Sequence, residues 1–485
     1  MRMTRQAIRI LLAASALAGC AVGPRYRPPT TPPQGAGPFT SALGAQVSAE
    51  PSSPTWWRLY DDPVLAGLVE QALIENQDLK VAAANLTYAE ALVGEARTAL
   101  LPTTDLSAGA VYGRSATGNA FAQVAGKSHA PSAWGYSTGF TAAYQVDLFG
   151  QVRRAIEAAK AGAGAASAAE DAVRVTVAAE TTSAYVQACG YAAQAAVARR
   201  SLDAAQQIYD ITLRQRDLGA VSDFDLTRAA ALLEQAKAVV PALDGQHRNA
   251  LLELTALLGK TPAEIPAEAA RCASPPQLSR PLPVGDGAAL LRRRPDVRQA
   301  ERTLAADTAR IGVAVSQLYP SVSLGGSITD AAGSLRQLSA PGSISYSVGP
   351  LITWSFPNIT LARAHIAEAR AQASGSLASF DSIVLQALKE TEQALTSYGA
   401  ELDRHGSLKA AAGQSNEALR LARIQYGAGS ASMLDLLTSQ SNAAAADQAL
   451  AASDQQLASD QVAVFQALGG GWEQAPPVTP PRIGG

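Results

Sequence analysis

Asn76-Gln-Asp-Leu-Lys in the first half of the chain matches Arg294-Pro-Asp-Val-Arg in the second half. In each copy the aspartate precedes a proline, Pro102 or Pro320, by 24 residues. Two copies of ~200 residues are too few and too long for a solenoid of short repeats. The duplication therefore predicts two halves of one pseudo-symmetric molecule.

A second match lies near the end of each half. Gly219, Ser222, Asp225 and Leu226 recur 210 residues later as Gly429, Ser432, Asp435 and Leu436. Glycine suits a turn that needs positive φ. Serine followed three residues later by a carboxylate is typical of a helix start. Each half is thus expected to contain a helix, a tight turn and a return helix.

The hydrophobic period changes from 3.6 to 2 after each of the two prolines. This alternation predicts four strands, at about residues 103–113, 135–148, 321–330 and 343–356. Strands of ~10 residues with one apolar and one small-polar face are typical of a transmembrane β-barrel. A soluble sheet with one wet face gives the same pattern in any single strand, but four symmetrically placed strands favour the barrel.

Long segments without proline follow each pair of strands. Residues 132–240 and 358–475 contain none, which permits long unbroken helices. We expect helices at about 150–217 and 358–425, each ~100 Å long at ~1.5 Å per residue. Shorter return helices would end at Gly259 and Gly469. The fold class is therefore mainly α, with a membrane β-barrel and a long α-helical barrel.

Four strands cannot close a membrane barrel alone, since the smallest have ~8 strands. Two copies would supply eight strands, whose interior side chains fill. Three copies would supply twelve, enough for a lumen. The counting therefore favours a homotrimer if the strands cross a membrane.

The N-terminus has the features of a targeting segment. Residues 1–19 contain three arginines and a short apolar run, followed by Leu17-Ala-Gly-Cys20, which matches a bacterial lipobox. We expect Cys20 to be lipidated, although a chance run of small residues before one cysteine is the alternative. Residues 20–55 are rich in Pro, Gly, Ser and Thr and predict an extended tether without a core of its own.

Composition excludes several other classes. The formal net charge is −2 over 485 residues, so no basic surface indicates nucleic acid. No mature segment reaches the ~18 uninterrupted apolar residues of a transmembrane helix. Cys189 and Cys272 could pair, but their contexts, a helix and a proline-rich linker, favour two unrelated thiols.

The sequence contains no catalytic or metal-binding pattern. The four histidines lack metal-ligand spacing. Gly259-Lys-Thr resembles the end of a phosphate loop, but the first glycine would have to stand at Leu254. Arg292-Arg-Arg294 could bind anions, but we interpret it as a solvated helix start. We expect no enzyme activity, no cofactor and no metal.

The chain resembles the outer-membrane efflux protein family, which is TolC-like, and its NodT-type lipoprotein branch. The resemblance is carried by Cys20-Ala-Val-Gly-Pro-Arg-Tyr, Trp56-Trp-Arg-Leu-Tyr, Asp147-Leu-Phe-Gly-Gln-Val and Leu291-Arg-Arg-Arg-Pro-Asp-Val. It covers roughly residues 20–472. Within that span we expect a first repeat at 56–265, a linker at 266–284 and a second repeat at 285–472, followed by a proline- and glycine-rich tail at 473–485.

The resemblance implies a trimer with a twelve-stranded barrel in the outer membrane and an α-helical barrel in the periplasm. It implies docking to a periplasmic membrane-fusion adaptor and to an inner-membrane pump of the resistance–nodulation–division class. The function implied is passive export of small molecules, such as drugs or other toxic compounds. A similar duct for type I protein secretion is the alternative. The exported substrate is not encoded here, because the pump selects it.

The resemblance also implies that the periplasmic tips meet the adaptor and close the duct. The matching residues are Arg216, Gly219, Ser222, Asp225, Tyr426, Gly429, Ser432, Leu434 and Asp435. Helix capping alone would also explain the serines and aspartates. If the aspartates converge in a trimer they need cations, for which Arg216 and Arg423 are nearest in sequence. Relatives often have an acidic residue where this chain has Thr438, so their gate cannot be transferred whole.

Overall fold

The computed structural model describes residues 21–30, 35–41, 46–114 and 116–481. The predicted signal peptide and Cys20 lie outside these residues. The chain divides into two compact units. Within the described residues, the strand unit draws on the N-terminal segment up to residue 28 and on 88–164 and 301–379, and the helical unit draws on 29–87, 165–300 and the part of the chain from residue 380 on. Each unit takes segments from both sequence repeats, so the units cut across the repeats.

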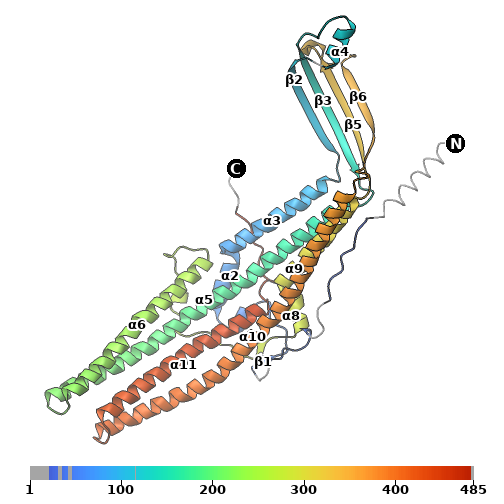
Figure 1. Ribbon diagram of the computed structural model, residues 1–485. Coiled ribbons are helices and arrows are strands. Elements are labelled where there is room, and N and C mark those ends of the chain that lie inside the picture. The colour runs from blue at the N-terminus through green and yellow to red at the C-terminus, as the bar shows by residue number, and fades with distance from the viewer. Residues whose placement is uncertain (1–20, 31–34, 42–45, 115, 482–485) are drawn as a thin grey trace. The chain divides into compact units, whose positions relative to one another are not determined.

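The strand unit contains one four-stranded antiparallel sheet (Figure 1). Its strands, in the order β2-β3-β5-β6, are β2 (Thr103–Gly113), β3 (Ala133–Val146), β5 (Ser321–Ala332) and β6 (Ile344–Thr353). The four predicted strands are thus present, with β6 ending earlier than the alternation suggested. The connections contain the helix α4 (Ala116–Val124) and the 3-10 turn η3 (Leu335–Gln337).

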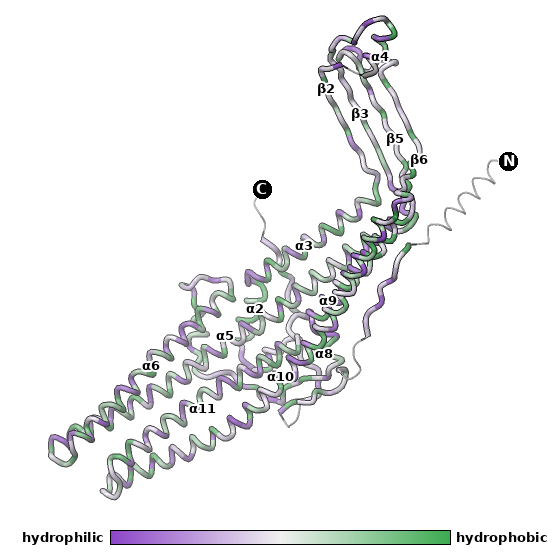
Figure 2. The backbone as a smooth tube through the Cα atoms, viewed as in Figure 1, coloured by the Kyte–Doolittle hydropathy of each residue, from purple (hydrophilic) through white to green (hydrophobic). Residues whose placement is uncertain are grey.

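Apolar residues form a row across all four strands. Leu106 lies opposite Phe140, Phe140 opposite Ile328, and Ile328 opposite Tyr346. All four side chains are exposed, and Leu106 and Tyr346 are 81% and 82% accessible. Figure 2 shows hydrophobic and hydrophilic positions interspersed along the strands. One face of the sheet therefore presents a band of large apolar side chains that the single chain does not cover.

The opposite face of the sheet has small side chains. The next row along the strands is Ser107, Gly139, Thr329 and Ser345, in register across the sheet. Successive residues of a strand point to opposite faces. The sheet is therefore two-sided, with one apolar face and one face of glycine and hydroxyl residues.

Two long helices run from the ends of the strand pairs. They are α5 (Gln151–Asp217, 67 residues) and α10 (Thr360–Gly427, 68 residues). Each is followed by a 35-residue return helix, α6 (Asp223–Leu257) or α11 (Met433–Ala467). Pro241 lies inside α6 without ending it. Among the described helices, none combines the length and apolar character that crossing a membrane requires.

The remaining elements are short or precede the strands. They are β1 (Val47–Ser48), η2 (Trp56–Tyr60), α2 (Pro63–Glu75), α3 (Gln77–Thr98), α7 (Ala267–Ala270), β4 (Leu282–Pro283), α8 (Gly287–Arg293) and α9 (Pro295–Ser316). The predicted break between α2 and α3 is present at Asn76. Its Oδ1 accepts hydrogen bonds from the N–H groups of Asp78 and Leu79, and so caps α3.

The main core lies in the helical unit. Trp56 is fully buried, and its ring stacks on Phe465 with the centroids 4.7 Å apart. The indole N–H of Trp56 donates to the carbonyl oxygen of Gly470 over 3.3 Å. A buried Trp needs such a partner for its polar edge. The core thus joins the entry of the folded chain to the end of α11.

The N-terminal segment qualifies one expectation. It was predicted as an extended tether without a core of its own, and it packs against the helical unit, where Phe39 is buried in the core. The carboxylate of Glu392 accepts the backbone N–H groups of Thr40 and Ser41 at 2.7 and 2.8 Å. The strand β1 pairs in parallel with β4. Composition alone could not show this, because the partners are hundreds of residues away.

The cysteines correct a second expectation. Cys189 and Cys272 were interpreted as two unrelated thiols, but they form a disulfide with their Cα atoms 5.0 Å apart. The bond links α5 to the segment between the repeats, across a sequence separation of 83 residues. Folding brings the linker against the helix, which the sequence contexts of the two cysteines did not reveal.

Candidate functional site: the two helix tips

The first tip connects α5 to α6. The long helix ends at Asp217, and Gly219 follows with φ +72°, a left-handed conformation that favours glycine. Ser222 then caps α6, and its Oγ accepts the N–H of Asp225 at 3.2 Å. Asp225 Oδ2 in turn accepts from the backbone N–H and the Oγ of Ser222. The predicted capping box is therefore formed.

The second tip, between α10 and α11, repeats this geometry. Gly429 has φ +75°. Ser432 caps α11, and Asp435 Oδ2 accepts from the Ser432 Oγ at 2.6 Å and from its N–H at 2.9 Å. The hydrogen bonds from the Ser432 hydroxyl and N–H lower the pKa of the Asp435 carboxyl. This side chain therefore stays charged at neutral pH.

An apolar cluster joins the two tips. Its buried members are Ile208, Ala229, Leu419, Met433, Leu436, Leu437 and Ala443, with contributions from all four tip helices. The hydroxyl of Tyr426 also donates to Oε1 of Gln215 across 2.6 Å. Figure 1 shows both turns at the same end of the helical unit. The structure thus brings the two sets of predicted tip residues together within one chain, and Gln215 is a tip residue that the sequence did not single out.

The arginines do not contact the capping aspartates within the chain. Arg216 forms ion pairs with Asp217 at 2.9 Å and Asp223 at 3.5 Å. Arg423 donates to Oε1 of Gln440. Within one chain the nearer Asp217, Asp223 and Gln440 take the donors of these arginines, and a role for them beside aspartates that converge in a trimer stays a prediction.

The first tip also exposes large apolar side chains. Leu218 and Phe224 are 84% and 68% accessible, and the guanidinium of Arg228 lies 5.3 Å from the centroid of the Phe224 ring. In the second tip Leu434 is half exposed, whereas Met433 is buried in the cluster. Sequence reasoning did not identify Leu218 or Phe224, although both stand in the turn region that it did identify. Both large apolar side chains are thus uncovered in the single chain.

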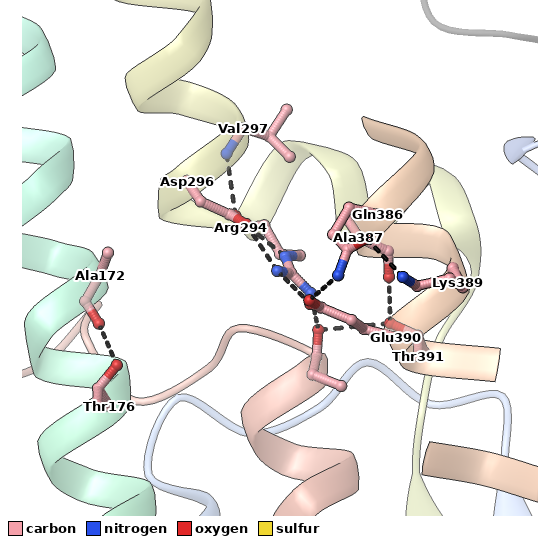
Figure 3. A network of polar contacts seen from close by, with 11 residues as sticks. Ala172, Thr176, Arg294, Asp296, Val297, Gln386, Ala387, Lys389, Glu390 and Thr391 are labelled. Atoms are coloured by element: carbon pink, nitrogen blue, oxygen red, sulfur yellow. Dashed lines mark hydrogen bonds and ion pairs between the residues drawn. The ribbon is translucent and has the colours of Figure 1, made fainter. Parts of the chain in front are cut away.

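The arginine run at 292–294 corrects a further expectation. Arg294 is buried, and its guanidinium pairs with Asp296 at 2.6 Å and Glu390 at 2.8 Å (Figure 3). It also donates to the carbonyl oxygen of Ala467 at the end of α11. Arg293 pairs with Glu473. These two arginines tie α9, α10 and the chain end together, so only Arg292 fits the solvated interpretation.

A cavity of about 490 Å³ lies beside this cluster, lined by residues of α5, α9, α10 and α11. The carboxylates of Asp296 and Glu390 in its wall are already occupied by Arg294. In the described part of the chain, no group of three or more His, Cys, Asp or Glu side chains could hold a metal ion. Because Arg294 joins Asp296, Glu390 and the carbonyl oxygen of Ala467, the cluster fastens α9, α10 and α11 together.

The comparisons with known proteins fit this geometry. The family model described as "Outer membrane efflux protein" matches residues 68–260 and 288–470. The chain belongs to the outer membrane efflux protein family. Its two matched stretches correspond to the two repeats recognised from the sequence.

Individual relatives cover nearly the whole chain. Nodulation protein T of Rhizobium leguminosarum bv. viciae is 31% identical over 468 residues, which are 96% of this chain and 93% of that protein. Outer membrane protein OprJ of Pseudomonas aeruginosa is 29% identical, with 98% of each chain covered. The solved outer-membrane channel OprN has 34% identity and a TM-score of 0.86, covering 93% of this chain and 100% of its own.

Membership of this family establishes the fold of the protein, its role and its location in the cell. The chain has the TolC-like fold and is the outer-membrane channel component of an efflux pump. It lies in the outer membrane and extends into the periplasm. The two-sided sheet and the helix tips are therefore parts of a channel, and their chemistry can be interpreted in that setting.

Proposed function

We propose that three copies of this chain form a passive duct that carries toxic small molecules from a periplasmic adaptor and an inner-membrane pump to the cell exterior. The observation that carries this proposal is the bare apolar row Leu106, Phe140, Ile328 and Tyr346 on an open sheet. An exposed apolar band of this kind is stable against lipid tails and costly in water.

The sheet of the single chain is open at both sides. The strands β2 and β6 form its two edges. Unpaired backbone groups at a sheet edge cannot be satisfied by hydrocarbon, so the sheet must close on itself in a membrane. Joining β6 of one copy to β2 of the next supplies the missing partners. Three copies give twelve strands, whose inner face would be the row of Ser107, Gly139, Thr329 and Ser345, suited to a water-filled lumen.

The tips are the proposed contact for the adaptor. Leu218 and Phe224 are exposed beside the turn of the first tip, where an apolar partner can cover them. Asp225 and Asp435, repeated three times around the mouth, would line or brace its closed state. The pump is proposed to be of the resistance–nodulation–division class, and the duct itself to catalyse no reaction.

Lipidation of Cys20 is part of the same proposal. The lipid would anchor each copy, while the strands cross the membrane. Replacing Cys20 with Ser should abolish incorporation of labelled palmitate, with Cys272→Ser as the control that keeps it. Equal labelling of wild type and Cys20→Ser would refute the lipid site.

A test in cells separates efflux from protein secretion. Deleting the gene should raise accumulation of a fluorescent toxic dye, and the wild-type gene should restore efflux. The proteins in the culture medium should stay unchanged. Unaltered dye accumulation together with the loss of one secreted protein would reassign the duct to protein secretion.

A further inference from the structure

We propose that a basic pocket in the strand unit binds the phosphate of an anionic phospholipid headgroup at the periplasmic surface of the outer membrane. The pocket is a cavity of about 520 Å³ between the N-terminal segment, α5 and α9. Its polar lining consists of Tyr26, Arg153, Glu157, Lys160 and Arg302. The inference rests on the proposed trimeric duct and on lipidation of Cys20.

The start of the mature chain is held at one end of the sheet. The N–H of Val22 donates to the carbonyl oxygen of Phe149 at 3.1 Å. A Cβ at Gly150 would lie 2.7 Å from the Cα of Ala21, so the backbone of residue 21 packs directly on this glycine. The guanidinium of Arg154 reaches the carbonyl oxygens of Val22 and Gly23. These contacts fasten the segment just beyond β3, which ends at Val146.

Covalent geometry then locates the lipid. Consecutive Cα atoms are ~3.8 Å apart, so the lipid on Cys20 must begin within one residue of Ala21. That lipid lies in the bilayer and not in the lumen. The side of the β3–α5 junction that Ala21 covers therefore faces the membrane, at the sheet end from which the helices leave.

The pocket lies a short way along the same segment. Tyr26 is five residues after Ala21, a span of at most ~18 Å, and its hydroxyl donates to Glu301 at 3.0 Å. Arg153 is in the first turn of α5, and Lys160 is ~10 Å further along that helix. Helical side chains lean toward the helix N-terminus, which here is the membrane side. Both cations can therefore reach the headgroup layer, which is ~5–8 Å deep.

The charges of the pocket favour an anion. Glu157, its one acid, pairs with Arg154 at 2.7 Å. Arg153 pairs with Asp147 at 3.2 Å. Among the described residues, neither Lys160 nor Arg302 forms a hydrogen bond or an ion pair, and both side chains are exposed. Two cations without acidic partners suit a phosphate diester, whereas the hydroxyl of Tyr26 is already committed to the carboxylate of Glu301.

The test uses the full-length protein with its covalent lipid attached. Phospholipid that co-purifies with it is removed in detergent, and the protein is examined by native mass spectrometry. Phosphatidylglycerol, phosphatidylcholine and inorganic phosphate are added separately. Wild type should retain one phosphatidylglycerol per protomer in preference to phosphatidylcholine. Lys160→Gln with Arg302→Gln should weaken this binding by roughly twenty-fivefold, since each surface cation contributes about fivefold. The matched control, Lys409→Gln with Arg248→Gln, removes two exposed cations outside the pocket and should bind as wild type does.

The outcomes separate the sources of the phosphate and the two proposals. If millimolar phosphate does not displace bound phosphatidylglycerol, the proposal of a phospholipid headgroup as ligand is supported. If free phosphate binds equally well, that proposal is contradicted. Unchanged binding in the pocket variant overturns the site. The same variant should still form trimers that conduct in planar bilayers. If the wild-type protein itself forms no trimers, the proposed function is contradicted instead.

Discussion

The hydroxyl of Tyr426 on α10 donates a hydrogen bond to Oε1 of Gln215 on α5, 2.6 Å away and 211 residues earlier in the chain. This contact lies between two helix pairs that also pack against each other near the tips through the apolar cluster around Met433. It is a polar link that must break or move if the pairs separate at the mouth of the duct.

Tyr426→Phe should make the closed mouth leakier, because it removes the hydroxyl and keeps the ring. A net hydrogen bond is worth about 1 kcal/mol, or about fivefold in the open population. Cells should become more sensitive to a large antibiotic that wild-type cells exclude. Tyr88→Phe, at an exposed tyrosine, is the control. Unchanged sensitivity in both variants would show that this contact does not hold the mouth.

Asp435 should stabilise the first turn of α11 in its charged form. Hydrogen bonds from Ser432 lower its folded pKa below the ordinary value of 3.8. The stabilisation is therefore present above pH 3.8 and lost as pH falls through the lowered folded pKa. Hydrogen exchange at this turn should accelerate in that acidic range beyond its intrinsic pH dependence. Asp435→Ala should show the faster exchange already at neutral pH, and Thr438→Ala should not.

Reduction of the disulfide should destabilise the helical unit. Closing a loop across a separation of 83 residues contributes about 4 to 5 kcal/mol in the chain-entropy model, as an upper bound. The midpoint of thermal unfolding should fall when reductant is added. The variant with both Cys189→Ser and Cys272→Ser should melt at that lower midpoint with or without reductant. A reductant effect that persists in this variant would exclude the disulfide as its cause.

Arg294→Gln should lower stability far more than Arg292→Gln. Arg294 is buried, and its loss leaves Asp296 and Glu390 without their partner. Because both carboxylates are more than a third exposed, we expect a loss of about 2 kcal/mol and not the larger value of fully buried pairs. Arg292 is exposed, and its replacement should change stability by less than ~0.5 kcal/mol. Equal unfolding midpoints in the two variants would contradict the fastening role.

The sequence predicted those features that depend on local pattern. Alternation over residues 321–330 and the Ser432–Asp435 spacing encode a strand and a helix cap, and both are present. It did not predict the contacts that form only when distant parts of the chain fold against each other. The Cys189–Cys272 bond, the burial of Arg294 and the Tyr426–Gln215 link join residues far apart in sequence. Their neighbours in sequence carry no sign of the partner, so only the folded chain reveals them.

The central claim is that this chain forms a conducting duct, and single-channel recording in planar bilayers tests it most directly. Full-length lipidated protein should insert as trimers and give discrete current steps. The steps should be small in wild type and larger when Tyr426→Phe and Asp435→Ala are combined, because the mouth is then easier to open. Trimers that insert but pass no current in either form would contradict the account.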